Sequence, residues 1–503
     1  MLTERHAQKI RGVLSCFDRV IITGTLADIG HAKAFTRELN RRRIRIFDFT
    51  EFTKPLREKI RDNAEALAGK HGLTIEFIRR IDAFRKEDRV QEILLQRGSH
   101  PGLVHIFSAM ETCPSFQPWH DKKTNATYLR PDTGKCLHYY FYFMDAELGL
   151  CYLRVPTWAP FRLQFYMNGH NWLASHLDRH KIGYKRIDNA FVDIEDFDAA
   201  QQIADGLHPK RLHRKLDRFA RELCPAASEF TAGYHWSLMQ VEYATDVVFR
   251  SREGLAPLYD HLVRTAVHAV RAEQVATFLG KKLDPRYLGE VGNNFNTRIQ
   301  GTRIRHQMGR VALKMYDKFG YVLRIETVVN DVSFFKHHRT VEHRDGTREQ
   351  KLAPVKKTVY SLGVLAGLLL AANRRYLEFL SSLDDDSEGR KRLDRLSSRV
   401  HDRNRSYSGI NFFDPDQRAL FLTLARGELN LRGFQVRDLR RVLKDWSGPE
   451  LSRHVKRLRM HHLVRKIGGT YRYHLTALGR RVIAAAMRIR EDSVIPALAG
   501  VPA

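Results

Sequence analysis

A helix start near the end of the chain is its strongest local pattern. In 447–450, Ser-Gly-Pro-Glu, serine suits the N-cap, proline suits the first turn, and the glutamate three residues past the cap completes a capping box. The helix that follows is predicted over 449–462. Its apolar residues recur on one face: Leu451, Val455 and Leu458. The pattern therefore predicts a helix that packs on one side and leaves a basic side outward.

Other elements surround this helix in a regular order. They are predicted as helices over 416–425, 436–445 and 478–490 and as strands over 463–467 and 470–476. Gly468-Gly469 joins the two strands and suits a tight hairpin, because glycine accepts a positive φ. The predicted order is helix, helix, helix, hairpin, helix.

In this order the segment 406–503 resembles the winged-helix domains of MarR-type bacterial regulators. The stretch RKIGGTYRYHLTALGRRVI is similar to their wing and the helix start after it. The resemblance implies that the basic helix enters the major groove of DNA and that the wing touches the adjacent backbone or minor groove. The residues implied as DNA contacts are Ser452, Arg453, Lys456 and Arg457 on the helix and Lys466 and Arg472 on the wing.

Charge points to the same class of partner. Lys and Arg total 85 against 57 for Asp and Glu, a formal net charge of +28. Such a surface attracts polyanions, because each cation placed on a phosphate releases counterions. The basic residues are spread through candidate helices and hairpins rather than gathered in one tail, which favours nucleic acid over a role in solubility or at an anionic membrane.

Neither a signal peptide nor a membrane span is evident. The first residues are charged at once, so we expect a cytoplasmic protein. The longest apolar stretch, around 362–372, is about half of what a membrane-spanning helix requires, so no membrane partner is expected. The five cysteines are widely spread without a CxxC pair, and this predicts reduced, packed thiols.

The remaining patterns predict an α+β multidomain protein. Its predicted parts are a small α/β domain at 1–100, an aromatic-rich α+β region with a β-hairpin at 101–205, a helical unit with a basic β-hairpin (302–329) at 206–383, a charged linker at 384–405 and the winged-helix domain at 406–503. The first domain is read as strand, helix, strand and helix over 17–26, 31–41, 44–49 and 54–70. Within 206–383, the stretch 206–288 is read as helical.

The aromatic-rich region is open to two interpretations. Aromatic residues such as Tyr139–Phe143, Trp158 and Tyr166 alternate with bases such as Arg154 and Arg162. Such a surface can stack unpaired nucleotides. An aromatic band in a sheet is also typical of a core.

A second resemblance lies in the basic hairpin. A "YDK" turn at 316–318 and the "LRIE" run that follows are similar to a segment of plasmid and phage rolling-circle replication initiators, which nick DNA through a tyrosine and a divalent metal. It implies Tyr316 as nucleophile, Lys318 as phosphate contact and Glu326 as metal ligand. The same hairpin supplies three further candidate nucleic-acid contacts: Arg303, Arg305 and Lys314.

Acidic residues on separated strands suggest a different enzyme. Asp18 lies on the first strand candidate, and Glu326 and Asp331 come much later. RNase H-like nucleases and transposases hold two metal ions with carboxylates contributed in this way. Mg²⁺ or Mn²⁺ is the cofactor expected of a nuclease here, and no other cofactor is indicated.

Three hypotheses remain open. The first is a DNA-binding protein of the mobile-element type, with the winged helix on duplex DNA and the basic aromatic body on further nucleic acid, with or without metal-dependent nicking or transposition. The second is a winged-helix transcriptional regulator without catalysis. The third is an RNA-binding component of a ribonucleoprotein. The partner is DNA on the first two hypotheses and RNA on the third, and a homodimer is left open.

Overall fold

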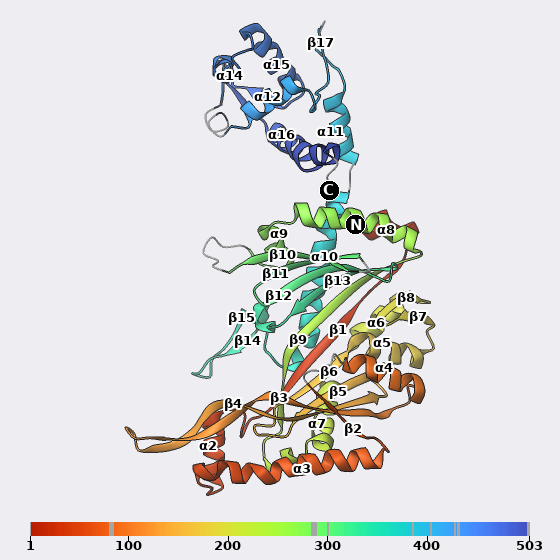
Figure 1. Ribbon diagram of the computed structural model, residues 1–503, viewed down its shortest axis with the longest axis vertical. Helices are drawn as coiled ribbons and strands as arrows, with labels where there is room; N and C mark the ends of the chain where they lie inside the picture. The colour runs from red at the N-terminus through yellow and green to blue at the C-terminus, as the bar shows by residue number, and fades with distance from the viewer. Residues whose placement is uncertain are drawn as a thin grey trace. The chain divides into compact units, whose positions relative to one another are not determined.

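The computed structural model describes residues 2–79, 85–282, 289–298, 301–384, 387–402, 405–426, 429 and 433–499. The chain forms two compact units, unit 1 (Met1–Asp384) and unit 2 (Asp385–Ala503), and each is described by itself. Unit 1 is mixed α/β around one large sheet (Figure 1). Among the described helices, none combines the length and apolarity that crossing a membrane requires.

The sheet of unit 1 has 11 strands. In spatial order they are β10 (Val291–Arg298), β11 (Gly301–Met308), β12 (Val311–Lys318), β13 (Val322–Val329), β9 (Tyr234–Phe249), β1 (Ile10–Leu26), β6 (Leu163–Asn168), β5 (Gly149–Pro156), β4 (Ala126–Asp145), β3 (Gly102–Asp121) and β2 (Ile75–Ile78). Neighbours run antiparallel, except that β2 and β3 are parallel. The predicted segments 1–100, 101–205 and 206–383 all contribute strands to this one sheet.

Short strands and helices complete unit 1. The helices are α1 (Leu2–Arg5), α2 (Ala32–Arg41), α3 (Phe49–Lys70), α4 (Lys86–Arg97), α5 (Gly169–His180), α6 (Phe197–Asp205), α7 (Pro209–Leu223), α8 (Arg252–Ala269), α9 (Ala272–Phe278) and α10 (Leu362–Asp384). Two small hairpins pair β7 (Tyr184–Ile187) with β8 (Ala190–Ile194) and β14 (Lys336–Glu342) with β15 (Arg348–Pro354).

The packing of α10 defines the two faces of the central strands. The side-chain amide of Asn373 on α10 donates to the hydroxyl of Thr245 and to the backbone oxygen of Tyr243, both on β9. Its carbonyl accepts from the hydroxyl of Thr327 on β13. Because side chains alternate along a strand, residues an odd number of positions from Thr245 and Thr327 point away from α10. Those residues include Glu242 and Glu326.

The described elements of unit 2 are α11 (Ser387–Ser397), β16 (Val400–Asp402), β17 (Arg405–Tyr407), α12 (Pro415–Leu424), α14 (Val436–Val442), α15 (Gly448–Met460), β18 (Val464–Lys466), β19 (Tyr473–Leu475), α16 (Ala477–Ile489) and α17 (Ile495–Leu498). The four helices and two strands expected over 416–490 are among them. The other elements were not predicted, and α11 and β16 lie within the segment predicted as a linker. The apolar stripe of α15 is buried in the core of unit 2. The β18–β19 hairpin is shorter than predicted, with three paired positions and a loop over 467–472.

Two secondary-structure predictions are wrong. The stretch read as helical over 206–288 contains β9, a 16-residue strand at the centre of the sheet. Its second half is buried on both faces and yet includes Glu242, Thr245 and Asp246, so apolar and polar residues do not alternate there as they do on a half-exposed strand. The strand expected over 44–49 is instead a short 3-10 turn, Ile46–Asp48, that leads into α3. The five cysteines are buried and free, as predicted.

Candidate metal centre and nucleic-acid interface

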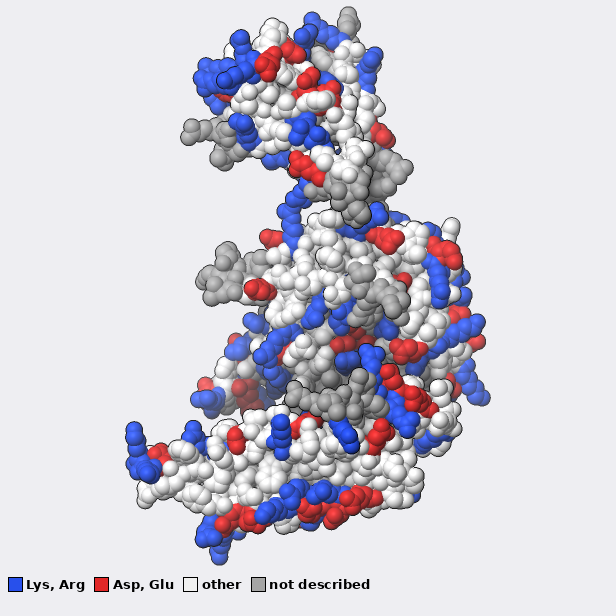
Figure 2. Space-filling view, viewed as in Figure 1, with Lys and Arg blue, Asp and Glu red and all other residues white. Residues whose placement is uncertain are grey.

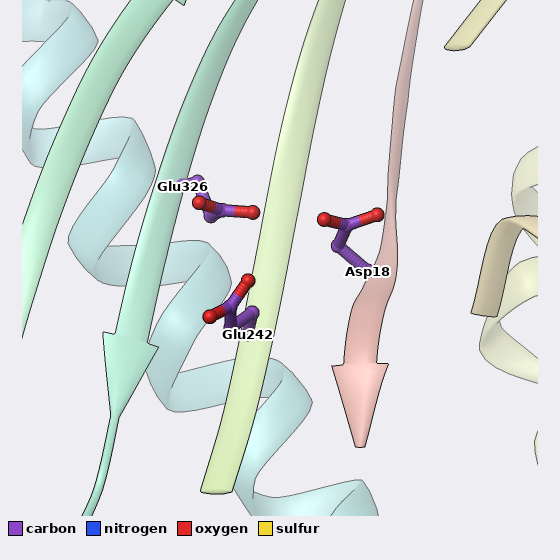
Figure 3. A group of neighbouring side chains, drawn as sticks. All are labelled: Asp18, Glu242 and Glu326. Atoms are coloured by element: carbon purple, nitrogen blue, oxygen red, sulfur yellow. The ribbon is translucent and has the colours of Figure 1, made fainter. Parts of the chain in front are cut away.

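Three carboxylates converge on the face of the sheet that points away from α10. Asp18 comes from β1, Glu242 from β9 and Glu326 from β13 (Figure 3). One oxygen from each side chain can be chosen so that all three lie within 4.8 Å of one another. The three residues are 7%, 6% and 1% exposed, respectively, so the group is largely removed from solvent.

A β-bulge contributes to this convergence. Phe17 pairs with Tyr243 and Arg19 pairs with Glu242, so Asp18 is an extra residue on β1 without a partner on β9. A bulge of this kind redirects a side chain, and bulges are frequent beside active sites. Glu326 is set by its own register, opposite Ala244 on β9 and Lys314 on β12.

Burial and mutual repulsion disturb the ionisation of the group. Burial, followed by the charge of Asp18, raises the pKa of Glu326 to about 7. The ammonium of Lys314 donates to Oε2 of Glu326 at 2.8 Å and lies 3.9 Å from Oε1 of Glu242. The other oxygen of Glu326, Oε1, is buried without a hydrogen-bond partner. One ligand atom in the centre of the group is therefore unsatisfied by the protein.

A buried ion-pair network adjoins Asp18. Arg324 donates from Nε to one oxygen of Asp246 at 2.6 Å and from Nη2 to the other at 2.7 Å. Its Nη1 is 3.6 Å from Asp18, and Nδ1 of His170 is 3.0 Å from the same Asp18 oxygen. Burial alone would raise the pKa of Asp18, but Arg324 and His170 outweigh it and hold that pKa well below its usual value. Asp18 therefore stays ionised beside Glu326.

Helix α5 brings His170 to this network. Asn168 caps the helix by accepting from the backbone amides of His170 and Asn171. A Cβ at Gly169 would lie 2.0 Å from the backbone oxygen of Phe17, so only glycine allows the helix to start this close to β1. The local sequence Asn-Gly-His thus places an imidazole against Asp18.

The donor set of the three carboxylates suits a hard divalent cation. Mg²⁺ and Mn²⁺ prefer carboxylate oxygens, and a cation would satisfy Oε1 of Glu326 and offset the repulsion that raises its pKa. Asp18 and Glu326 were both predicted from the sequence, and the structure brings them together. Glu242 was not predicted.

Two further predicted residues of unit 1, Asp331 and Tyr316, are not members of the three-carboxylate group. Asp331 accepts from Ser333 and pairs with Lys357 at 3.1 Å, so the structure does not place it with the three carboxylates. Tyr316 pairs with Arg324 across β12 and β13. Burial, followed by the charge of Glu326, raises the pKa of Tyr316 well above its usual value, so its hydroxyl keeps its proton.

The predicted basic contacts of the hairpin differ in their surroundings. Lys314 is committed to Glu326, and Lys318 donates to Asn189 and lies 3.4 Å from Asp188. Arg303 and Arg305 are half-buried on β11, the second strand from one edge of the sheet. Most of the predicted aromatic platform is core: Tyr139–Phe143, Phe161, Phe165 and Trp172 are buried. Tyr152, Trp158 and Tyr166 are half-buried.

The basic helix of unit 2 divides into an outward and an inward set. Ser452 and Arg453 are exposed, and Lys456 is half-buried with its ammonium 5.6 Å from the ring centroid of Tyr407. Arg457 turns inward: its guanidinium donates to the backbone oxygens of Ser408 and Gly409 and to Oε1 of Gln417. The expectation that Arg457 faces outward is wrong, because it ties α15 to the segment before α12.

The predicted wing residues lie on and beside the β18–β19 hairpin. Lys466 is exposed and lies 5.3 Å from the ring centroid of Tyr471, which is itself 80% exposed. Arg472 is half-buried, at the end of the loop before β19. In Figure 2 lysine and arginine side chains are spread over the visible faces of both units.

Sequence reasoning missed Glu242 and Asp246. A signal existed for both: in VEYATDVVF, Glu242, Ala244 and Asp246 alternate with Tyr243, Thr245 and Val247, as residues on the two faces of a strand do. Reading β9 as a strand would have put both acids on one face.

No protein-family model, curated protein or solved structure matches this chain. What the site can do therefore rests on its geometry and chemistry.

Proposed function

We propose that the chain is a nucleic-acid-binding protein of the mobile-element type, in which unit 2 acts as a winged helix and contacts duplex DNA through α15. The observation that carries this proposal is the exposure of Ser452 and Arg453 on α15. The opposite stripe of the helix is anchored in the core of unit 2. A rigidly held helix with a basic outward side is the form in which proteins read the major groove.

The contacts that support the proposal are few and specific. Arg453 can take O6 and N7 of guanine with both guanidinium nitrogens, a pairing that discriminates by about 1–3 kcal/mol. Lys456 and, on the hairpin, Lys466 are suited to phosphates, which position the protein without reading sequence. Arg457 is excluded from the contact set, because its donors are used within unit 2.

Salt dependence tests this proposal directly. Binding of a labelled duplex is measured by fluorescence anisotropy at several salt concentrations. We expect a steep fall in affinity, and a slope of log K against log salt that decreases by about 0.9 when a phosphate contact is removed in Lys466→Ala. Arg453→Ala should weaken binding more than Arg488→Ala, a matched change at an exposed arginine on α16. Equal affinity in dilute and concentrated salt, or equal effects of the two arginine variants, would overturn the proposal.

A second function is favoured by the three-carboxylate group. We propose that Asp18, Glu242 and Glu326 hold Mg²⁺ or Mn²⁺ and support cleavage or transfer of a phosphodiester. The metal, when bound, polarises a phosphate oxygen and lowers the pKa of a bound water. Arg324 and His170 hold Asp18 in place, and Lys314 holds Glu326. The support is the unsatisfied buried Oε1 of Glu326 amid two further carboxylates.

Metal binding is measured separately from activity. Titration of Mn²⁺, followed by the loss of the electron paramagnetic resonance signal of free Mn²⁺, should give one strong site in the wild type. We expect Glu242→Gln to abolish this site and Asp331→Asn to leave it unchanged. Labelled single- and double-stranded DNA incubated with Mg²⁺ or Mn²⁺ then tests cleavage. Strong Mn²⁺ binding that survives Glu242→Gln would refute the assignment, and Mn²⁺ binding without cleavage would leave a metal site and remove the enzyme.

A further inference from the structure

A cavity of about 300 Å³ lies at the end of the same sheet face, apart from the carboxylates. Its walls come from six strands of the sheet, β1, β3, β4, β5, β6 and β9, and from the segment between β5 and β6. Residues with polar side chains that line it include Thr23, His138, Arg154, Arg162 and Gln164. Trp158 and Met239 supply an apolar part of the lining.

The charge of this cavity is incompletely balanced. Arg154 donates to Glu111 at 2.6 Å, so its charge is offset. Arg162 is exposed and has no acidic partner within the described part of the chain. The Nε of Arg154 is buried without a hydrogen-bond partner. An anionic ligand in the cavity would therefore meet the uncompensated charge of Arg162 and the unused Nε donor of Arg154.

The remaining lining suits a base rather than an inorganic anion. The indole of Trp158 is held in place, because its Nε1 donates to Ser115 at 3.0 Å and its ring meets Phe49 edge-on at 6.2 Å. Burial, followed by the charge of Arg154, lowers the pKa of His138 to about 4, so this imidazole is neutral near pH 7. Its Nδ1 lies 3.1 Å from the backbone oxygen of Cys136, which can only accept; Nε2 is thus left as an acceptor. A fixed aromatic edge, an acceptor and a side-chain amide are what base recognition uses.

The cavity and the carboxylates are connected along one face. Gln164 lines the cavity, and Tyr166, two residues further along β6, lies on the same side. The guanidinium of Arg19 is 5.9 Å from the ring centroid of Tyr166, and its Nε is 4.0 Å from Glu242. The side chain of Arg19 is 45% exposed, so its guanidinium is open to solvent at this point of the face. At about 3.3 Å for each residue of strand, Thr23 in the cavity is roughly 17 Å from Asp18 along β1.

We propose that this cavity binds one nucleotide of a single-stranded nucleic acid whose backbone continues over Arg19 toward the three carboxylates. Arg162 takes the phosphate of that nucleotide, and its base lies against Trp158. This rests on the proposed function in nucleic-acid binding and adds a second contact, in unit 1, for an unpaired strand. Cations that follow the backbone beside aromatic rings are typical of single-strand sites.

Binding of short probes to the full-length protein tests the proposal. The probes are fluorescein-labelled hexathymidylate, unlabelled dTMP as competitor, and the labelled duplex used for α15, all without added divalent metal. We expect Arg162→Ala to weaken hexathymidylate binding roughly tenfold, since a charge-assisted contact is lost. Met239→Glu, which adds a negative charge at a 53% exposed position of the lining, should weaken it as well, and Met239→Gln should not. Arg264→Ala, at an exposed arginine of α8, is the matched control.

The outcomes separate this proposal from the function of α15. Hexathymidylate binding that falls in Arg162→Ala and Met239→Glu but not in Arg453→Ala supports the cavity. The cavity proposal is overturned if the protein does not bind hexathymidylate, or if neither Arg162→Ala nor Met239→Glu changes that binding. This holds even if duplex binding still depends on Arg453. Competition by dTMP as strong as that by unlabelled hexathymidylate overturns the connection to a strand. Circular dichroism of each variant confirms that the fold is intact.

Discussion

The buried carboxylate of Glu326 should make unit 1 less stable as the pH rises. In the folded chain its pKa is raised to about 7 from 4.5, so between these values the folded state holds a proton that the unfolded state releases. Stability is therefore full below about pH 4.5 and is lost as the pH rises through 7. At about 1.36 kcal/mol for each pH unit, the full loss is about 3 kcal/mol.

Glu326→Gln removes this penalty and keeps an oxygen for Lys314. The variant should match the wild type in free energy of unfolding near pH 4.5 and exceed it by about 3 kcal/mol at pH 8. A bound metal offsets most of this difference, because only the wild type binds it well. Mn²⁺ at a hundred times its dissociation constant should stabilise the wild type by about 2.7 kcal/mol and nearly close the gap at pH 8.

Urea unfolding at several pH values, with and without Mn²⁺, is the assay. Four of the five tryptophans lie in unit 1, so their fluorescence reports mainly on that unit. Glu65→Gln, at an exposed position of α3, is the matched control and should follow the wild type. A difference between Glu326→Gln and the wild type that is constant from pH 4.5 to 8 would refute the electrostatic reasoning. A gap at pH 8 that Mn²⁺ leaves unchanged would refute the metal site.

Three further changes test contacts elsewhere in the chain. Arg457→Ala should destabilise unit 2 by about 1–3 kcal/mol, since its hydrogen bonds to Ser408, Gly409 and Gln417 are lost. Thermal unfolding followed by circular dichroism measures this loss, and Arg453→Ala should show none. Arg324→Met leaves the buried carboxylate of Asp246 without its ion pair and should cost about 3–5 kcal/mol in urea unfolding; an unchanged midpoint would contradict the role given to this network. Gly479→Ala puts a Cβ 2.1 Å from the backbone oxygen of Leu463, so the melting temperature of unit 2 should fall, and an unchanged value would show that α16 can move away from that backbone.

The local patterns that predicted elements well are those that do not depend on distant contacts. The Ser447–Glu450 capping box is present, with Ser447 accepting from the amide of Glu450, and it begins α15 where the sequence indicates. The turn between β12 and β13 follows directly after the YDK run, which itself ends β12, and has a positive φ at Phe319 and Gly320. Caps and turns are set by a few adjacent residues, so a single sequence is enough to find them.

The sheet could not be assembled in the same way. β9 joins β1 to β13, and its 16 residues lie in a stretch predicted as helical, because buried polar residues such as Glu242 and Asp246 interrupt the alternation in its second half. Without β9, the segments 1–100, 101–205 and 206–383 look like separate domains. Pairing between strands so far apart in the chain depends on tertiary packing, which a periodicity argument does not contain.

For the carboxylate group too, the sequence indicates the residue types but not where they lie in the fold. The residue types were readable: Asp18 and Glu326 were singled out because acids on separate strands are a means of holding metal ions. Glu242 joins the group because of the side of β9 on which it lies and because of one extra residue in β1. Asp331 is excluded because it lies beyond the end of β13, at the start of a short 3-10 turn. A one-residue change in that register would turn Asp18 or Glu242 toward α10 and dissolve the group. The bulge at Asp18 is thus the structural condition for any chemistry that these carboxylates perform, and deleting the adjacent Phe17, which removes the extra residue and retains all three acids, should remove Mn²⁺ binding.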